Sequence, residues 1–271
     1  MMDMEPVLTL ATKRRTAELL ALVSLVGAVG IYALGQGTDV LTDFAVYGLV
    51  VYMGTAALVG IFVYLKLKPS KFSNVVLGYA LGLLSWAVGL SIYAYAYYVT
   101  NIGLPYVSVA DVFYLLSYPP WMISAWGMLR VFAGAIGRRA RLAVLSTGVL
   151  LYILVAAFVV PASVSGLNNA LDIFVTVLYP TLDIAFFLMI FALFLAFRKG
   201  VFEKPFAFMA FGTMLLALGD LTYAVLSTMN LYYDGNPMDL MLFFGCISAG
   251  YGFWRQYADL TGVYSHMRKV A

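Results

Sequence analysis

Residues 172–197 read DIFVTVLYPTLDIAFFLMIFALFLAF, a run without lysine, arginine or histidine. A helix of this length crosses a hydrocarbon core of roughly 30 Å at 1.5 Å per residue. Similar apolar runs recur along the whole chain of 271 residues, of which 63% are hydrophobic and only 11% are charged. Soluble domains carry about 25% charged residues. The sequence therefore predicts an all-α polytopic membrane protein and excludes a water-soluble globule.

Eight transmembrane helices are expected. Their approximate ranges are 17–35, 44–65, 74–98, 111–133, 142–161, 172–197, 205–230 and 239–257. The membrane domain then covers residues 17–257, between cytoplasmic tails at 1–16 and 258–271.

The positive charges predict the orientation of these helices. All 16 lysine and arginine residues fall on one side of an eight-helix threading, close to helix ends. By the positive-inside rule that side is cytoplasmic. We therefore expect a multi-pass protein of the cell membrane with both termini inside. The net charge of +3 follows from this topology, so no nucleic-acid partner is expected.

An internal repeat relates the inward-running helices. The spacing D-x6-Y-P begins at Asp111 and again at Asp172, and Asp239 and Asp43 open two further spans in a similar way. We interpret the chain as four degenerate helical hairpins. Each aspartate is expected to cap a helix, because a carboxylate accepts from free N–H groups at the positive end of the helix dipole.

Prolines follow the tyrosines of this repeat. Pro119, Pro120 and Pro180 are expected to kink two helices at the same depth, because proline removes an intrahelical hydrogen bond. Such kinks would splay the outer halves of the helices and open an outward-facing cavity; the alternative is that the kinked helices pack together without a cavity.

Two carboxyl groups are expected deep in the membrane. Asp183 and Asp220 lie about 15–16 Å below the outer ends of their spans, and a lipid-facing charge at that depth is costly. We expect them to share an interior ligand-binding site. Its further candidate residues are Tyr118, Tyr179, Tyr223 and Trp86. A purely structural hydrogen-bonded role is the alternative.

Several kinds of site are disfavoured by residue counts. The chain has one cysteine, Cys246, and one histidine, His266, so neither a disulfide framework nor a metal or haem site is expected. A retinal Schiff base needs a lysine deep in a late helix, but Lys204 lies at the rim of its span. No cofactor is expected.

Residues 102–120 read IGLPYVSVADVFYLLSYPP. This stretch resembles the PYPSxADxxYLxxYP signature of multi-helix membrane sensor modules that precede diguanylate cyclase and histidine kinase domains in prokaryotes. Asp183 and Asp220 resemble later aspartates of that module, so the resemblance extends over about residues 74–257. Val107 departs from it, because the family usually has proline there.

Three classes of function remain open. The resemblance implies a stand-alone sensor that binds a small or lipidic ligand, and since no output domain follows Ala271, we expect a separate cytoplasmic or membrane signalling partner. A secondary transporter would instead use the midplane carboxylates and broken helices for alternating access. An intramembrane enzyme would use Asp183 and Asp220 as an acid and base, although no nucleophile is evident.

Overall fold

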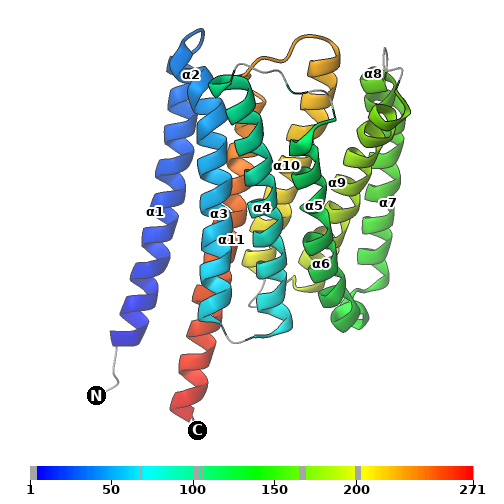
Figure 1. The fold of residues 1–271 in the computed structure, drawn as a ribbon. Helices are drawn as coiled ribbons and strands as arrows, with labels where there is room; N and C mark the ends of the chain where they lie inside the picture. Colours follow the sequence, from blue (N-terminus) through cyan, green and yellow to red (C-terminus); the bar gives the residue numbers. More distant parts are fainter. Residues whose placement is uncertain are drawn as a thin grey trace.

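The computed structural model describes residues 5–67, 69–100, 104, 107–164, 169–198 and 203–270. This part of the chain is 88% helical and contains no strand. The predicted all-α class is confirmed, and the protein is a bundle of long, roughly parallel rods (Figure 1).

The rods are built from eleven α-helices within the described residues. These are α1 Glu5–Leu34, α2 Asp39–Asp43, α3 Leu49–Lys66, α4 Lys71–Ala94, α5 Val109–Leu116, α6 Tyr118–Phe132, α7 Arg138–Leu154, α8 Val160–Val164, α9 Ala170–Ala196, α10 Glu203–Thr228 and α11 Asp239–Val270. Short π-helical turns join α2 to α3 (Phe44–Gly48), extend α4 (Tyr95–Val99) and join α7 to α8 (Val155–Val159), and a 3-10 turn (Ala133–Ala135) follows α6. Within the described residues these helices therefore form eight rods.

Six helices in the described part are long and apolar enough to cross a membrane. They comprise α1, α2 with α3, α4, α7 with the turn that follows it, α9 and α10. The other two predicted spans are also helical, but α5 and α6 are separated at Ser117 and α11 carries more polar residues. A multi-pass membrane protein is consistent with these helices.

Six rods form a closed ring. In order around it, α3, α4, α6, α9, α10 and α11 each pack against the next, and α11 returns to α3. Two rods lie outside the ring, because α1 packs against α11 and α7 packs against α9 (Figure 1). The apolar windows of α1 and α7 are each only 11% buried, as expected for helices that face lipid on most sides.

Aromatic rings fill the interior of this ring. Trp121 of α6 stacks on Phe186 of α9 with ring centroids 4.8 Å apart, and its edge meets Tyr79 of α4 at 5.8 Å. The Trp121 indole also donates to the Tyr79 carbonyl at 2.8 Å. It can lie so close to α4 because residue 82 is glycine, where a Cβ would overlap the indole. The bundle centre is therefore a packed core.

The first and last helices are tied together near the chain ends. Asp259 of α11 accepts from Arg14 of α1, and its other oxygen lies 3.2 Å from Arg255 Nε. Arg255 also lies 3.5 Å from Glu18 of α1, which accepts from Tyr251 at 3.1 Å. The predicted tails are thus helical where they are described, since α1 begins at Glu5 and α11 continues to Val270.

Candidate functional site

Two reciprocal tyrosine–aspartate hydrogen bonds join the rods that carry the D-x6-Y-P repeat. Tyr118 of α6 donates to Asp183 Oδ1 of α9 at 2.7 Å. Tyr179 of α9 donates to Asp111 Oδ1 of α5 at 2.8 Å. The rings of the two tyrosines lie 6.5 Å apart, between the two bonds. The repeated motif therefore forms a direct contact between its two copies.

The axial offset of these rods explains the pairing. In the sequence the two copies of the motif are about 61 residues apart, whereas the bonded residues are 65 and 68 apart. The helix α9 is therefore displaced toward its N-terminal end by four to seven residues relative to α5 and α6, which is roughly 6–10 Å at 1.5 Å per residue. This displacement brings each tyrosine level with the aspartate of the other rod.

The helix starts differ from the predicted N-caps. Ser108 is the N-cap of α5, and Asp111 is the third residue of its capping box, with Oδ2 accepting from the Ser108 N–H at 2.7 Å. Asn169 caps α9, while Asp172 lies in the first turn. Placing the N-cap on these two aspartates was therefore wrong by three residues.

The other two predicted caps also behave differently. Asp43 makes no side-chain cap, because it lies inside the continuous helical segment that Thr38 caps. Asp239 is the first residue of α11, and its Oδ2 accepts from the Gly235 N–H at 3.1 Å. The carboxyl group of Asp239 therefore does bind backbone at a helix start.

Asp183 has one carboxyl oxygen without a partner. Its side chain is 5% exposed, and its Oδ1 accepts from Tyr118. Its Oδ2 is buried and makes no hydrogen bond to any protein atom. A buried oxygen in this state is costly, so the position is suited to a proton or to a donor or cation supplied from outside the chain.

Asp220 of α10 is an acidic residue that interacts electrostatically with Asp183. It is half-buried and lies within electrostatic reach of Asp183, Tyr118 and Tyr179. The ion pairs in the described residues lie between α1 and α11 or within α11, and none includes Asp183 or Asp220. The carboxyl groups of α9 and α10 thus interact with no basic side chain paired to either.

An aromatic wall of Trp121, Trp86 and Tyr114 packs beside Tyr118. Trp121 meets Tyr118 edge-on at 5.3 Å and Trp86 at 5.7 Å, and Trp86 meets Tyr114 at 6.4 Å. Trp86 therefore belongs to the wall, one ring away from Tyr118. Trp121 was not among the predicted site residues, although it follows Tyr118 by three positions and so lies on the same helix face.

Tyr223 lies further from the Asp183 and Asp220 pair than predicted, toward the C-terminal end of α10. Its ring meets Tyr232 edge-on at 4.7 Å, and its side chain is 45% exposed. Tyr232 donates to Asp239 Oδ1 at 3.2 Å, and Tyr32 of α1 donates to Asp239 Oδ2 at 3.3 Å. Tyr223 therefore lies beside a second acidic cluster, at the end of the bundle where α11 begins.

This second cluster joins three parts of the chain. Asp234 accepts from Tyr98, at the end of α4, and from Tyr232 at 3.4 Å. Asp239 is 3% exposed and has a donor on each oxygen. The sequence did not predict these bonds from tyrosine to aspartate. With both oxygens of Asp239 satisfied, the cluster is a structural clasp.

The predicted outward-facing cavity was expected to follow from two equivalent kinks. The rod is interrupted at Ser117, before the tandem Pro119 and Pro120, but α9 continues through Pro180. The kinks are therefore not equivalent. One groove lies between α4 and α6 and another between α7 and α10, and neither of these is lined by Asp183 or Asp220.

The donor set of the site limits what it could hold. Among the described residues, no three histidine, cysteine, aspartate or glutamate side chains gather as a metal site would require. The pair offers carboxyl oxygens and tyrosine hydroxyls to a proton or to a small cationic group.

Comparison with protein families, curated proteins and solved structures gives no match for this chain.

Proposed function

We propose that the protein is a membrane sensing module in which the Asp183 and Asp220 pair binds a proton or a small cationic ligand. The observation that carries this proposal is the buried, unpartnered Oδ2 of Asp183 beside a second carboxyl group. Paired acidic groups inside a membrane bundle commonly mark a proton or ion site. The resemblance of residues 102–120 to prokaryotic membrane sensor modules supports the same class.

Binding at this pair would be transmitted through the reciprocal bonds. A proton or cation on Asp183 changes the strength of the bond from Tyr118, and so the contact between α6 and α9. The same two rods are joined by the bond from Tyr179 to Asp111, so a shift in one bond alters the other. Asp220 lies on α10, which packs against α11. These two helices extend the change toward the cytoplasmic ends, where a signalling partner would respond.

Eight spans with both termini cytoplasmic form part of this proposal. The first and last helices begin and end at the same end of the bundle, which requires an even number of crossings (Figure 1). The clustering of all 16 cations near helix ends supports the orientation.

The proposal is tested by tryptophan fluorescence in lipid nanodiscs as a function of pH, with the proton as the probe. Trp121 lies against Tyr118, so its emission reports on the bond to Asp183. We expect the wild-type chain to show a pH-dependent transition that Asp183→Asn abolishes. The amide keeps an acceptor for Tyr118 and adds donors at nearly the same volume, so the thermal stability should change little.

Asp172→Asn is the matched control, because Asp172 is on the same helix but only in its first turn. It should keep the wild-type transition. A wild-type profile in Asp183→Asn, or the same loss in Asp172→Asn, would reject the proposed site.

A proton-coupled transporter is the second candidate. It is favoured by one observation, the interruption of the α5–α6 rod at Ser117 next to Tyr118, since broken helices beside midplane carboxyl groups are typical of transporters. Proteoliposomes loaded with a pH-sensitive dye distinguish the two. Proton flux that depends on Asp183 identifies a transporter, whereas the fluorescence transition without flux identifies a sensor.

A further inference from the structure

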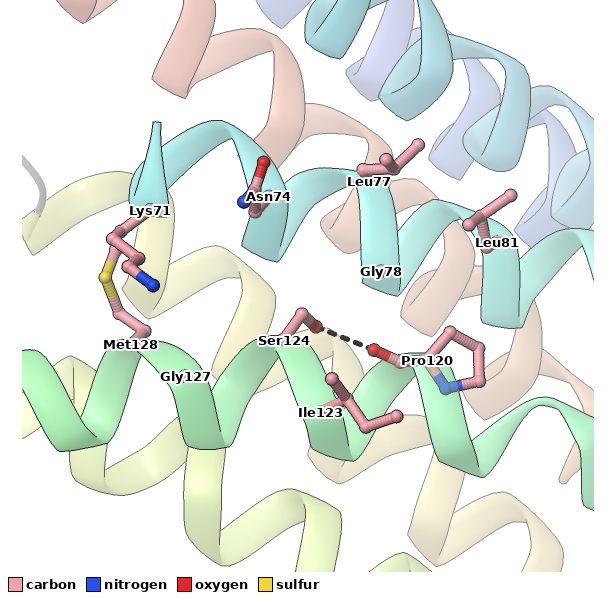
Figure 2. A pocket seen from close by; sticks show the side chains of 10 residues that line it. All are labelled: Lys71, Asn74, Leu77, Gly78, Leu81, Pro120, Ile123, Ser124, Gly127 and Met128. Atoms are coloured by element: carbon pink, nitrogen blue, oxygen red, sulfur yellow. Dashed lines mark hydrogen bonds between the residues drawn. The ribbon is translucent and has the colours of Figure 1, made fainter. Parts of the chain in front are cut away.

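A groove of about 380 Å³ runs between α4 and α6 on the outside of the ring. Figure 2 shows Lys71 and Asn74 at one end of it and the side chains of Leu77 and Leu81 further along α4. The opposite wall is α6, with Ile123 projecting along it. The groove therefore has one polar, cationic end and apolar walls.

Small residues create this groove. A Cβ at Gly78 would overlap the Ser124 side chain and the Pro120 carbonyl, so the two helices touch there and form the floor. A Cβ at Gly127 would meet no atom within 4 Å, so the chain leaves open space above that position. The groove is thus closed below by helix contact and open toward the membrane.

The dimensions match one leaflet of a bilayer. Lys71 is the first residue of α4, where the membrane-spanning segment begins. From Lys71 to Leu81 the helix rises roughly 15 Å, which is about half of a 30 Å hydrocarbon core. The walls face the lipid, since Ile123 is 72% exposed and Leu81 is 41% exposed.

We propose that this groove binds an anionic phospholipid. The phosphate lies against the Lys71 ammonium and the Asn74 amide, and one acyl chain lies along Leu77, Leu81 and Ile123. Charge complementarity selects the occupant, because basic pockets between membrane helices on the cytoplasmic side bind acidic headgroups. A fully apolar partner would leave Lys71 unused, and a soluble anion would leave the apolar walls uncovered. This site is independent of the Asp183 and Asp220 pair.

Native mass spectrometry of the full chain tests the proposal with two lipids that share their acyl chains, dioleoylphosphatidylglycerol and dioleoylphosphatidylcholine. We expect the wild type to bind the anionic lipid more tightly. Lys71→Gln should weaken phosphatidylglycerol binding about fivefold, the effect of one basic residue near an anionic headgroup, and leave phosphatidylcholine binding unchanged. Gly127→Leu should weaken both lipids, because position 127 lines the groove and a Cβ there enters open space, so the added side chain takes up room that the lipid needs.

Two matched controls complete the design. Lys66→Gln removes an exposed cation from the end of α3, outside the groove. Gly27→Leu places the same side chain in equally open space on α1. Both should bind the two lipids as the wild type does.

Three outcomes with the wild type and the lysine variants would overturn the proposal. These are equal affinity of the wild type for both lipids, an unchanged Lys71→Gln variant, and an equal loss in Lys66→Gln, which would indicate diffuse surface charge. If Gly127→Leu leaves both affinities intact, the acyl chain does not occupy the groove and the proposal also fails. Should Gly127→Leu not fold, Lys71→Gln alone still decides.

Discussion

Gly60 lies where three helices of the ring meet. A Cβ added there would lie 2.6 Å from Ala80 Cβ of α4 and 2.9 Å from Phe253 Cδ2 of α11, whereas ordinary van der Waals contact begins at 3.4 Å. Ala80 and Phe253 are both 0% exposed. The Ala80 methyl group has no rotamer through which to move aside, so Gly60→Ala must push α3 and α4 apart.

The expected loss of stability follows from two opposing terms. Overpacking of a close-packed core costs about 1–3 kcal/mol. Alanine is a better helix former than glycine by up to about 1 kcal/mol, which offsets part of that cost. Gly54→Ala isolates the first term, since Gly54 is on the same helix and a Cβ there meets nothing within 4 Å. We expect Gly60→Ala to be about 1–3 kcal/mol less stable than Gly54→Ala.

The single cysteine supplies the assay. Cys246 is 1% exposed on α11, which packs against α3, so a thiol-reactive fluorogenic dye reacts with it only after the bundle opens. Melting curves in detergent then report unfolding directly. At roughly 2–4 °C per kcal/mol for domains near this size, the two variants should differ by several degrees.

A double substitution tests the cause of that difference. Ala80→Gly removes the atom nearest to the added Cβ, so it should recover part of the stability of Gly60→Ala. The reasoning is refuted if Gly60→Ala melts at or above the temperature of Gly54→Ala, or if Ala80→Gly lowers both backgrounds equally.

Two further predictions concern the cap and the topology. Asp111→Ala removes both a capping bond and the bond from α9, so it should destabilise the protein by about 2 kcal/mol or more, against about 0.3–1 kcal/mol for Asp172→Ala, which loses only a helix-dipole interaction; equal melting temperatures in the same dye assay would contradict this. In a Cys246→Ala background, a cysteine at Gly103 should react with an impermeant maleimide from outside the cell and one at Gly137 should not, and the reverse labelling would overturn the orientation.

The helical class was predictable because it depends on apolar length, a local property of each run. The break between α5 and α6 at Ser117 was harder to predict. Proline composition predicted equivalent kinks, but Pro119 and Pro120 remove two successive N–H donors from one rod, while Pro180 removes a single donor from α9. The helix α9 continues through that one loss, as membrane helices with neighbours often do.

The residues of the site were easier to predict from the sequence than the hydrogen bonds between them. Depth arithmetic placed Asp183 and Asp220 at one level, and the structure brings them within electrostatic reach. The bond from Tyr179 to Asp111 was missed because the repeat suggested equal depths for the two rods. The axial displacement of α9 arises from helix packing between distant segments. It cannot be read from the spacing of residues along the sequence.

The uninterrupted length of α11 has a mechanical consequence. Its 32 residues extend without a break from Asp239 to Val270. Asp239 is fixed by hydrogen bonds from Tyr32 and Tyr232. At 1.5 Å per residue the helix is roughly 48 Å long, well beyond the thickness of a hydrocarbon core. If this helix tilts as a rigid body about its Asp239 end, each degree of tilt moves the Val270 end by about 0.8 Å, given that length. The ion pair between Arg14 and Asp259 lies toward the Val270 end of α11, where such a displacement is largest.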